Sequence, residues 1–513
     1  MSALLQSTEA ARSPIHTSRA WSVMPMAAVL VASAGVGFGR PFRSNQNTYL
    51  LHAVGPSLSP LGDDWLLHTT DPYPIFTAPA RLASDWMGFA VESFVLVLAA
   101  FTGLYLVAST LLRTTPRTLR TAVPSPAVLL VSAACYLLPH ILVPAQSWVY
   151  PFRGFGGHYL MSIPSLFQAS DCGSLMLLGG GIAVWAIASR LRRLLWVIAA
   201  GLAVATCALH PTYLAPLAIA LLGFAVADVA TQGTIRRFGW YTGTGLAAVI
   251  VVVATNSVVR DSLTHDAGDP QRYLAFERIP HHSLVSHWNV HDVFLAVVVL
   301  AGAGLTVSLT RAWWAGIVLT VCLVIAVATA LTVEVTRNVT LAMMFPWRIT
   351  VFLVPVATVT VIVSLLRPSA ERIRNVKILF IVAACLMPLC LGVGTYLTLT
   401  AQDPGSERAV RALRAAGPSG VGLIPLELEN VRLNTPAAVY VDWKSHPYAS
   451  ADLAEWQRRI AAVKSAETDD ALFCRLVRQE KIAWVMVRPD RTPPACIVGW
   501  RRAGSDDVRI YIG

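Results

Sequence analysis

The chain has 513 residues, of which 55% are hydrophobic and only 13% are charged. Soluble domains usually carry about 25% charged residues, so this composition excludes an ordinary soluble domain. The formal net charge of +11 could suit a nucleic-acid-binding protein. However, the basic residues form short clusters at the ends of apolar runs, a pattern typical of membrane proteins. Because the sequence contains no RNA- or DNA-binding motif, we expect no nucleic-acid partner.

The apolar residues come in runs of about 17 or more, long enough for a helix to cross roughly 30 Å of hydrocarbon. We therefore expect a polytopic α-helical membrane protein, with residues 21–400 forming a transmembrane domain of eleven spans. The predicted spans are 21–38, 87–112, 126–144, 167–189, 194–209, 214–231, 239–258, 292–310, 313–334, 349–366 and 378–400.

The basic clusters indicate how these spans are oriented. If all eleven are real, every cluster falls on one side of the membrane, which the positive-inside rule identifies as the cytoplasm. Residues 1–20 are then cytoplasmic, and residues 401–513 are extracytoplasmic. The stretch "VASAG" (Val31 to Gly35) resembles a cleavage site, so the first span could instead be a signal peptide. We expect an uncleaved anchor, because the apolar run is long for a signal.

The predicted outer loops are long and rich in Asp, His, Trp and Tyr, whereas the inner loops are short and basic. Because long loops often carry function, we expect the functional face to be extracytoplasmic. The predicted outer segments are 39–86, 145–166, 210–213, 259–291 and 335–348.

The first outer loop contains the stretch "LSPLGDDWLLHTTDPYPIF" (Leu58 to Phe76). Asp63 or Asp64 could act as a general base on an acceptor hydroxyl. Together they could also hold a divalent cation, Mg²⁺ or Mn²⁺, that neutralises a phosphate leaving group. The alternative is a solvated loop in which an Asp caps a helix beginning at "DWLL". Asp71, next to Pro72, is expected to form a turn.

A second candidate is Arg348 in "FPWRIT" (Phe345 to Thr350), at the outer mouth of the tenth predicted span. An arginine at the membrane boundary usually has a partner, and its planar fork would suit a phosphate. The alternative is an arginine that extends to the interface beside Trp347 in the aromatic belt.

Several other residues at the outer face are candidate substrate contacts. His210 and Tyr213 lie in "HPTY", and His158 lies in "FGGHYL". Each histidine could equally be part of the hydrogen-bonded structure. Asp171 near the start of the fourth predicted span is a further candidate, because acidic groups at that depth are uncommon.

The stretch "HHSLVSHWNVH" (His281 to His291) is dense in histidine. If it were helical, His287 and His291 would share one face, with Asp292 adjacent, and could bind a transition metal. A solvated or substrate-lining loop is the favoured interpretation.

The tail, residues 401–513, has charges throughout and short apolar runs, which predict a small α/β domain. Strands are expected at 421–428, 437–443, 482–489 and 508–513, and helices at 449–466 and 468–480. Cys474 and Cys496 could form a disulfide if the tail is extracytoplasmic. Lys444, in "VYVDWKSHPY" (Val439 to Tyr448), follows a predicted strand end, a common place for ligands. This loop could instead dock the tail on the membrane domain.

These features together resemble the GT-C superfamily of integral-membrane glycosyltransferases. The resemblance rests on many spans with a cytoplasmic N-terminus, an acidic pair in the first outer loop and an extracytoplasmic C-terminal domain. More narrowly, "NQNTYLLHAV" (Asn45 to Val54), "DDWLLHTTDPYPIF", "HPTYL" and "VYVDWKSHPY" resemble a largely uncharacterised group of bacterial membrane proteins of similar layout.

The resemblance implies a multi-pass enzyme of the bacterial inner (plasma) membrane. It implies sugar transfer from a polyprenyl-phosphate-sugar donor in the lipid to a glycan, lipid or protein acceptor. The first-loop acid is the base or metal ligand in such enzymes, a role that would fall on Asp63 or Asp64. An arginine near the outer face commonly meets the donor phosphate, and Arg348 matches by position. The chain lacks a "WWDYG" motif, which argues against transfer to protein asparagine.

Two other functions remain open. The chain could be a transporter or flippase for a lipid-linked glycan, although transporters place ionisable groups near the bilayer midplane. It could also be a non-catalytic assembly or sensor protein whose tail binds a partner.

Overall fold

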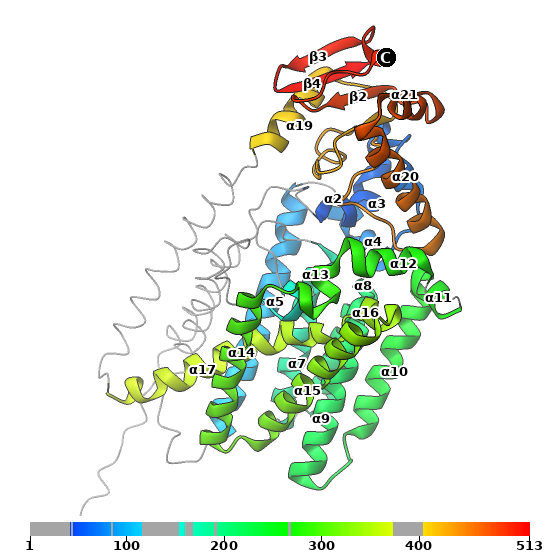
Figure 1. The fold of residues 1–513 in the computed structure, drawn as a ribbon. Coiled ribbons are helices and arrows are strands. Elements are labelled where there is room, and N and C mark those ends of the chain that lie inside the picture. The colour runs from blue at the N-terminus through cyan, green and yellow to red at the C-terminus, as the bar shows by residue number, and fades with distance from the viewer. Residues whose placement is uncertain are drawn as a thin grey trace, which may run out of the picture.

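The structure is a computed structural model that describes residues 42, 45–83, 86–114, 153–158, 160, 168–188, 192–264, 268–372 and 404–513. Three predicted spans, at 21–38, 126–144 and 378–400, lie outside the described residues. The described part is mostly helical, with a small sheet region near the C-terminus (Figure 1).

Each of the eight other predicted spans overlaps a helix of the described residues. Six helical segments are long and apolar enough to cross a membrane: Ala169–Ile187, Pro211–Gln232, Phe238–Thr255, Val290–Thr310, Trp313–Thr336 and Val339–Ile362. The predicted spans 87–112 and 194–209 contain the shorter apolar segments Phe94–Val107 and Arg193–Leu209. The chain is therefore a polytopic helical membrane protein, while the total of eleven spans stays a prediction.

The helices of the membrane domain pack as a bundle (Figure 1). They are α5 (Trp86–Thr114), α7 (Gly173–Ala188), α8 (Arg192–Leu209), α9 (Leu214–Gln232), α10 (Phe238–Thr255), α14 (Val290–Thr310), α15 (Trp313–Thr336) and α17 (Thr350–Arg372). Glycine allows the closest approach. A Cβ on Gly181 would lie 2.6 Å from the carbonyl oxygen of Gly103, so α5 and α7 contact backbone to backbone, as is common between membrane helices.

Short elements gather at the end of the bundle that faces the tail (Figure 1). They are α2 (Gln46–Tyr49), α3 (Leu51–Val54), α4 (Pro74–Ala83), α11 (Ser257–Thr264), α12 (Asp269–Tyr273), α13 (Pro280–Ser283) and α16 (Val339–Met344). The amide of Asn256 donates to the carbonyl of Pro72 at 2.8 Å, and the amide N–H of Thr70 donates to Asp452 at 2.9 Å. The first predicted outer segment thus contacts the end of the span predicted at 239–258 and the tail.

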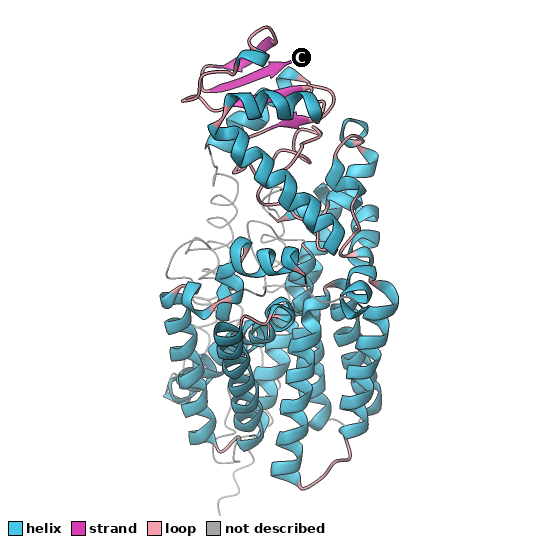
Figure 2. Ribbon diagram, turned by 45° about the vertical axis from the view of Figure 1, so that its right-hand side comes forward, coloured by secondary structure: helices cyan, strands magenta, loops and turns pink. Residues whose placement is uncertain are grey.

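The tail forms a four-stranded sheet covered by helices (Figure 2). The strand order is β1-β2-β4-β3, with β1 and β2 parallel and the other pairs antiparallel. Its elements are α19 (Pro404–Ala416), β1 (Gly422–Leu423), α20 (Ser450–Thr468), α21 (Asp470–Gln479), β2 (Trp484–Val487), β3 (Arg501–Ser505) and β4 (Val508–Ile512). Cys474 in α21 and Cys496 form a disulfide.

The predicted helices 449–466 and 468–480 and the strands near 482–489 and 508–513 are confirmed. The strand predicted at 437–443 is wrong, because only Val439 forms a bridge, to Gly422. The other edge of Val439 is occupied: its N–H donates to Asp64 at 2.9 Å, and its carbonyl accepts from Arg432 at 3.2 Å. Side chains thus take the place of a neighbouring strand.

Candidate functional site

Asp64 lies in a buried junction between the first loop and the tail. Its side chain has no exposure and caps the short 3-10 helix Trp65–His68 by accepting from the N–H of Leu66 at 3.0 Å. The other carboxylate oxygen accepts from Nε of Arg432 at 2.7 Å. Arg432 also pairs with Asp442, whose second oxygen accepts from the N–H of Ser445 at 2.6 Å. Asp64 therefore connects two regions 368 residues apart.

The two neighbouring carboxylates have different environments. Asp63 is exposed, whereas both oxygens of Asp64 already accept hydrogen bonds. The pair therefore does not fit a site in which both carboxylates bind one divalent cation. Among the residues that the structure describes, no group of three or more His, Cys, Asp or Glu could hold a metal ion. Asp71 forms the predicted turn by accepting from the N–H of Tyr73 at 2.8 Å.

Arg348 lies in the 3-10 helix Pro346–Ile349, just before α17. Its side chain is only 8% exposed, and Trp347 is fully buried, so the interpretation of Arg348 as an interfacial arginine is wrong. The guanidinium donates from Nη1 to the hydroxyl of Thr212 and lies 5.3 Å from the ring centre of Tyr213. Within the described ranges, it forms no ion pair with a carboxylate, and Nε has no hydrogen-bond partner.

His210 continues the network that begins at Arg348. Its Nδ1 lies 2.7 Å from the hydroxyl oxygen of Thr212. Because Thr212 accepts from Arg348, its single hydrogen is available to Nδ1, and in that arrangement the ring proton lies on Nε2. Nε2 faces the hydroxyl of Tyr49 at 3.5 Å. Burial, with a smaller contribution from Arg348, holds the pKa of His210 well below its ordinary value, so the ring is neutral.

Arg348, Thr212, His210 and Tyr213 form one cluster. His158 and His282 extend it. Their rings stack with centroids 4.4 Å apart. Nδ1 of His282 donates to the carbonyl of Gly156 at 2.7 Å, which leaves Nε2 as the acceptor. Gly156 has φ of +74°, and a Cβ there would lie 2.9 Å from the carbonyl oxygen of His282, so this turn requires glycine.

The stacked histidines are also neutral. Burial and then Arg348 hold the pKa of His158 well below its ordinary value. Nε2 of His158 is buried without a hydrogen-bond partner. His158 and Arg348 each pack near Phe345, with the His158 ring centroid 5.3 Å and the guanidinium 6.0 Å from that ring. The sequence-predicted residues Arg348, His158, His210 and Tyr213 therefore belong to one cluster.

The tail contributes the other wall of this cluster. Tyr448 packs against Tyr73, with centroids 5.8 Å apart, and Tyr73 stacks on His210 at 4.9 Å. His446 lies 5.0 Å from Tyr448, ring to ring. The loop that carries Lys444 therefore docks on the membrane domain, as one of the two interpretations expected, and it also places polar side chains beside the cluster.

Asp171 supports the cluster from behind. It is buried, and its carboxylate accepts from the N–H of Gln168 at 3.3 Å at the start of the 3-10 helix Ala169–Cys172. The hydroxyl of Tyr213 donates to the carbonyl of Ser170 in the same turn. Asp171 therefore helps to form the turn that accepts the hydrogen bond from Tyr213.

The predicted shared helical face of His287 and His291 is absent. His287 ends the 3-10 helix Val285–His287, whereas His291 lies in the first turn of α14. Both are exposed. Asp292 pairs with Arg153 at 2.9 Å.

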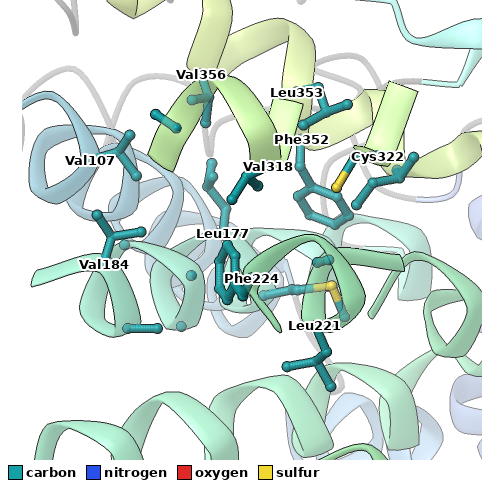
Figure 3. Close-up of a pocket in the computed structure, with 18 of the residues that line it drawn as sticks. Val107, Leu177, Val184, Leu221, Phe224, Val318, Cys322, Phe352, Leu353 and Val356 are labelled. Atoms are coloured by element: carbon teal, nitrogen blue, oxygen red, sulfur yellow. The ribbon is translucent and has the colours of Figure 1, made fainter. Parts of the chain in front are cut away.

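An apolar cavity of about 210 Å³ lies inside the bundle (Figure 3). Figure 3 shows Leu177, Phe224 and Phe352 among the side chains that line it. Ile349, directly after Arg348, is also in its wall. Phe352 packs 5.7 Å from the ring of Tyr213, over which the Arg348 guanidinium lies. The apolar cavity therefore borders the cationic site.

Sequence reasoning did not assign a role to Tyr49, His282 or Arg278, which tertiary packing brings to the cluster. His446 stood out in the sequence only as a neighbour of Lys444 in "VYVDWKSHPY". The histidine-rich stretch 281–291 was a partial signal, although it pointed to the exposed His287 and His291 rather than to His282.

The comparisons with known proteins identify one segment. A family model described as a domain of unknown function (DUF6798) matches residues 416–463. The matched segment includes Arg432, Asp442, Lys444 and His446, which form the junction with Asp64 and the tail wall of the cluster. No curated protein matches the chain.

Proposed function

We propose that this protein is a membrane glycosyltransferase. It moves a sugar from a polyprenyl-phosphate-linked donor to a glycan or lipid acceptor on the extracytoplasmic side of the bacterial plasma membrane. The observation that carries the proposal is Arg348, a buried arginine without a carboxylate partner among the described residues. A buried charge is costly unless it is paired, so an anionic ligand is the expected partner.

The surroundings of Arg348 favour a phosphate attached to a lipid. A guanidinium matches the oxygens of a phosphate through parallel hydrogen bonds. The adjacent cavity, bordered by Ile349 and Phe352, would take the first isoprene units of the donor. Neutral His158 and His210 leave Arg348 as the cation that faces the phosphate, and their ring nitrogens can bond to sugar hydroxyls.

Asp63 is the acid of the first-loop pair that can act as general base. It is exposed, whereas the oxygens of Asp64 are occupied by Arg432 and backbone N–H groups. In this proposal Asp63 accepts the proton of the acceptor hydroxyl, and Asp64 positions the loop.

The orientation in the membrane is part of the proposal. With the eleven predicted spans, the basic clusters favour a tail outside the cytoplasm under the positive-inside rule. The Cys474–Cys496 disulfide supports the same orientation, because disulfides persist in oxidising compartments such as the periplasm and are rare in the cytosol.

The test is sugar transfer by the purified full chain in nanodiscs. A panel of radiolabelled polyprenyl-phosphate sugars is supplied with a membrane extract as acceptor. We expect Arg348→Gln to reduce transfer by about 100-fold or more. The matched control is Arg337→Gln, since Arg337 is a partly exposed arginine at the same end of the bundle.

Two results would contradict the proposal. Transfer by Arg348→Gln at the wild-type rate would remove its central residue. Donor binding without transfer, unchanged in Asp63→Asn, would favour the transporter or assembly function instead.

A further inference from the structure

A second cationic group lies on the tail side of the cluster, built by Arg278 and Lys444. Arg278 is 9% exposed. Its Nε donates to the carbonyl of Trp443 at 2.7 Å, and Nη2 to the carbonyl of Lys444 at 3.4 Å. The guanidinium also lies 5.1 Å from the ring centre of Trp443. Within the part of the chain that the structure describes, neither Arg278 nor Lys444 forms an ion pair with a carboxylate. The carboxylate of Glu429 acts on both from a longer distance and raises their pKa values, whereas burial lowers the pKa of each overall. Two cations therefore share one distant acid.

An unpartnered acceptor lies beside these cations. His446 donates from Nδ1 to the carbonyl of Lys444 at 3.1 Å, the same carbonyl that Arg278 contacts. Its Nε2 is therefore the lone-pair nitrogen, and it is buried without a hydrogen-bond partner. The side chain is 8% exposed. An acceptor that is buried without a donor, next to two cations, indicates that a ligand with hydroxyl groups and negative charge binds here.

The second cationic group faces the same histidines as Arg348. The ring of His446 lies 5.0 Å from that of Tyr448, Tyr448 packs against Tyr73 at 5.8 Å, and Tyr73 stacks on His210 at 4.9 Å. A continuous row of rings therefore joins the Arg278–Lys444 group to the histidine that is linked to Arg348 through Thr212. Two cationic poles, Arg348 toward the bundle and Arg278 with Lys444 toward the tail, therefore flank one histidine cluster.

We propose that the bound substrates carry two anionic groups, one at Arg348 and a second at the Arg278–Lys444 pole. The inference rests on the proposed function and extends it, because a polyprenyl monophosphate would supply only the first group. The second anion could be the outer phosphate of a lipid diphosphate, or an acidic group on the acceptor sugar. In either case Nε2 of His446 accepts a hydroxyl hydrogen of the attached sugar.

The test measures binding to the full chain in nanodiscs of neutral lipid. The probes are a long-chain polyprenyl monophosphate, the corresponding diphosphate, and glucuronic acid. The variant is Lys444→Met, because the ammonium makes no hydrogen bond to the described residues and its loss should leave the fold intact. The control is Lys464→Met, since Lys464 contacts the same Trp443 ring at 4.4 Å but is exposed.

The results separate the two sources of the anion. If the lipid is the source, Lys444→Met weakens diphosphate binding by about tenfold and leaves monophosphate binding unchanged. If the acceptor is the source, the same variant weakens glucuronic acid binding and spares both lipids. Lys444→Met and Lys464→Met that behave alike with all three probes would overturn the inference.

Binding of the two lipid phosphates to Arg348→Gln tests the donor site independently. Arg348→Gln is expected to weaken both lipid phosphates. Unchanged binding of both lipids in that variant would reject the phosphate role of Arg348, whichever result Lys444→Met gives.

Discussion

Arg432 and Arg348 are both buried arginines, but their surroundings differ. Arg432 is enclosed by two carboxylates, Asp64 and Asp442, and also donates to the carbonyl of Val439. Arg348 has one hydroxyl partner, Thr212, and an unbonded Nε. The first arginine has its hydrogen-bonding capacity largely used within the protein. The second retains hydrogen-bonding capacity beside a cluster of neutral histidines.

This difference separates a structural charge from a candidate functional one. A satisfied buried ion network holds segments in one arrangement, and its loss leaves unpaired charges. A buried cation without a counter-charge costs free energy in folding and is available to an anion. The same distinction applies to the neighbouring acids: Asp64 belongs to the satisfied network, whereas Asp63 is exposed.

The largest effect is expected for Arg432→Met. The substitution leaves Asp64 and Asp442 buried without a counter-ion, so we expect the tail and first loop to be destabilised by about 5 kcal/mol. Limited proteolysis and denaturation in detergent would detect release of the tail. An exposed arginine of the same domain, Arg502, provides the control. Retention of a protease-resistant tail would contradict the role assigned to this junction.

Substitutions of Asp64 and Asp63 are expected to differ in their effect on stability. Asp64→Asn removes one charge of the buried network, and we expect a loss of about 3 kcal/mol in the free energy of unfolding. Asp63→Asn should change that free energy by less than about 0.5 kcal/mol, as for most surface positions. Equal destabilisation by both would contradict the division between them. Loss of sugar transfer in a stable Asp63→Asn protein would identify the base.

Acid should destabilise the tail side of the cluster through His446. Burial and then Arg278 lower the pKa of His446 to about 3, compared with about 6.5 for an exposed histidine. Below pH 6.5 the unfolded chain therefore binds a proton that the folded chain does not. Stability should fall as pH decreases from about 6.5 towards 3, by up to about 1.4 kcal/mol per pH unit.

The measurement is the pH dependence of unfolding between pH 7 and pH 5. The slope is set by the number of protons taken up on unfolding, and we expect His446→Gln to reduce that number by about one. A His446→Gln protein with the wild-type slope would show that another group carries the dependence.

A small effect on stability, compared with Arg432→Met, is expected for Arg348→Met. Because Arg348 lacks a counter-ion among the described residues, its removal should change the free energy of unfolding by less than about 1 kcal/mol. Thermal unfolding of this variant and Arg432→Met under the same conditions makes the comparison direct. A loss as large as that of Arg432→Met would place Arg348 in the structural class.

The membrane helices could be predicted from the sequence because each is a long apolar run that local composition reveals. Most tail elements followed from short-range patterns too. The strand β3 was missed because Arg501–Ser505 lacks alternating apolar residues and is largely exposed. The strand predicted near Val439 failed because Asp64 and Arg432 occupy its edge, and no local pattern announces such a partner.

The candidate site could be predicted only in part. Arg348, His210 and His158 stood out because polar groups at the ends of apolar runs are unusual. Their assembly depends on contacts between distant segments, such as His158 with His282. The acids were predicted as a pair because they are adjacent in the chain. One lies in a buried network and the other in solvent, a difference that only the position of Arg432 reveals.

The junction at Asp64 has a consequence for how the chain is made. Asp64 is synthesised early, but its partner Arg432 follows 368 residues later, after every described membrane helix has emerged. Until then the carboxylate of Asp64 has no arginine to pair with. A chain that ends before the tail would therefore have a membrane domain whose first loop is not held by the Asp64–Arg432 ion pair. Quality control could recognise an unfinished chain by that loop alone.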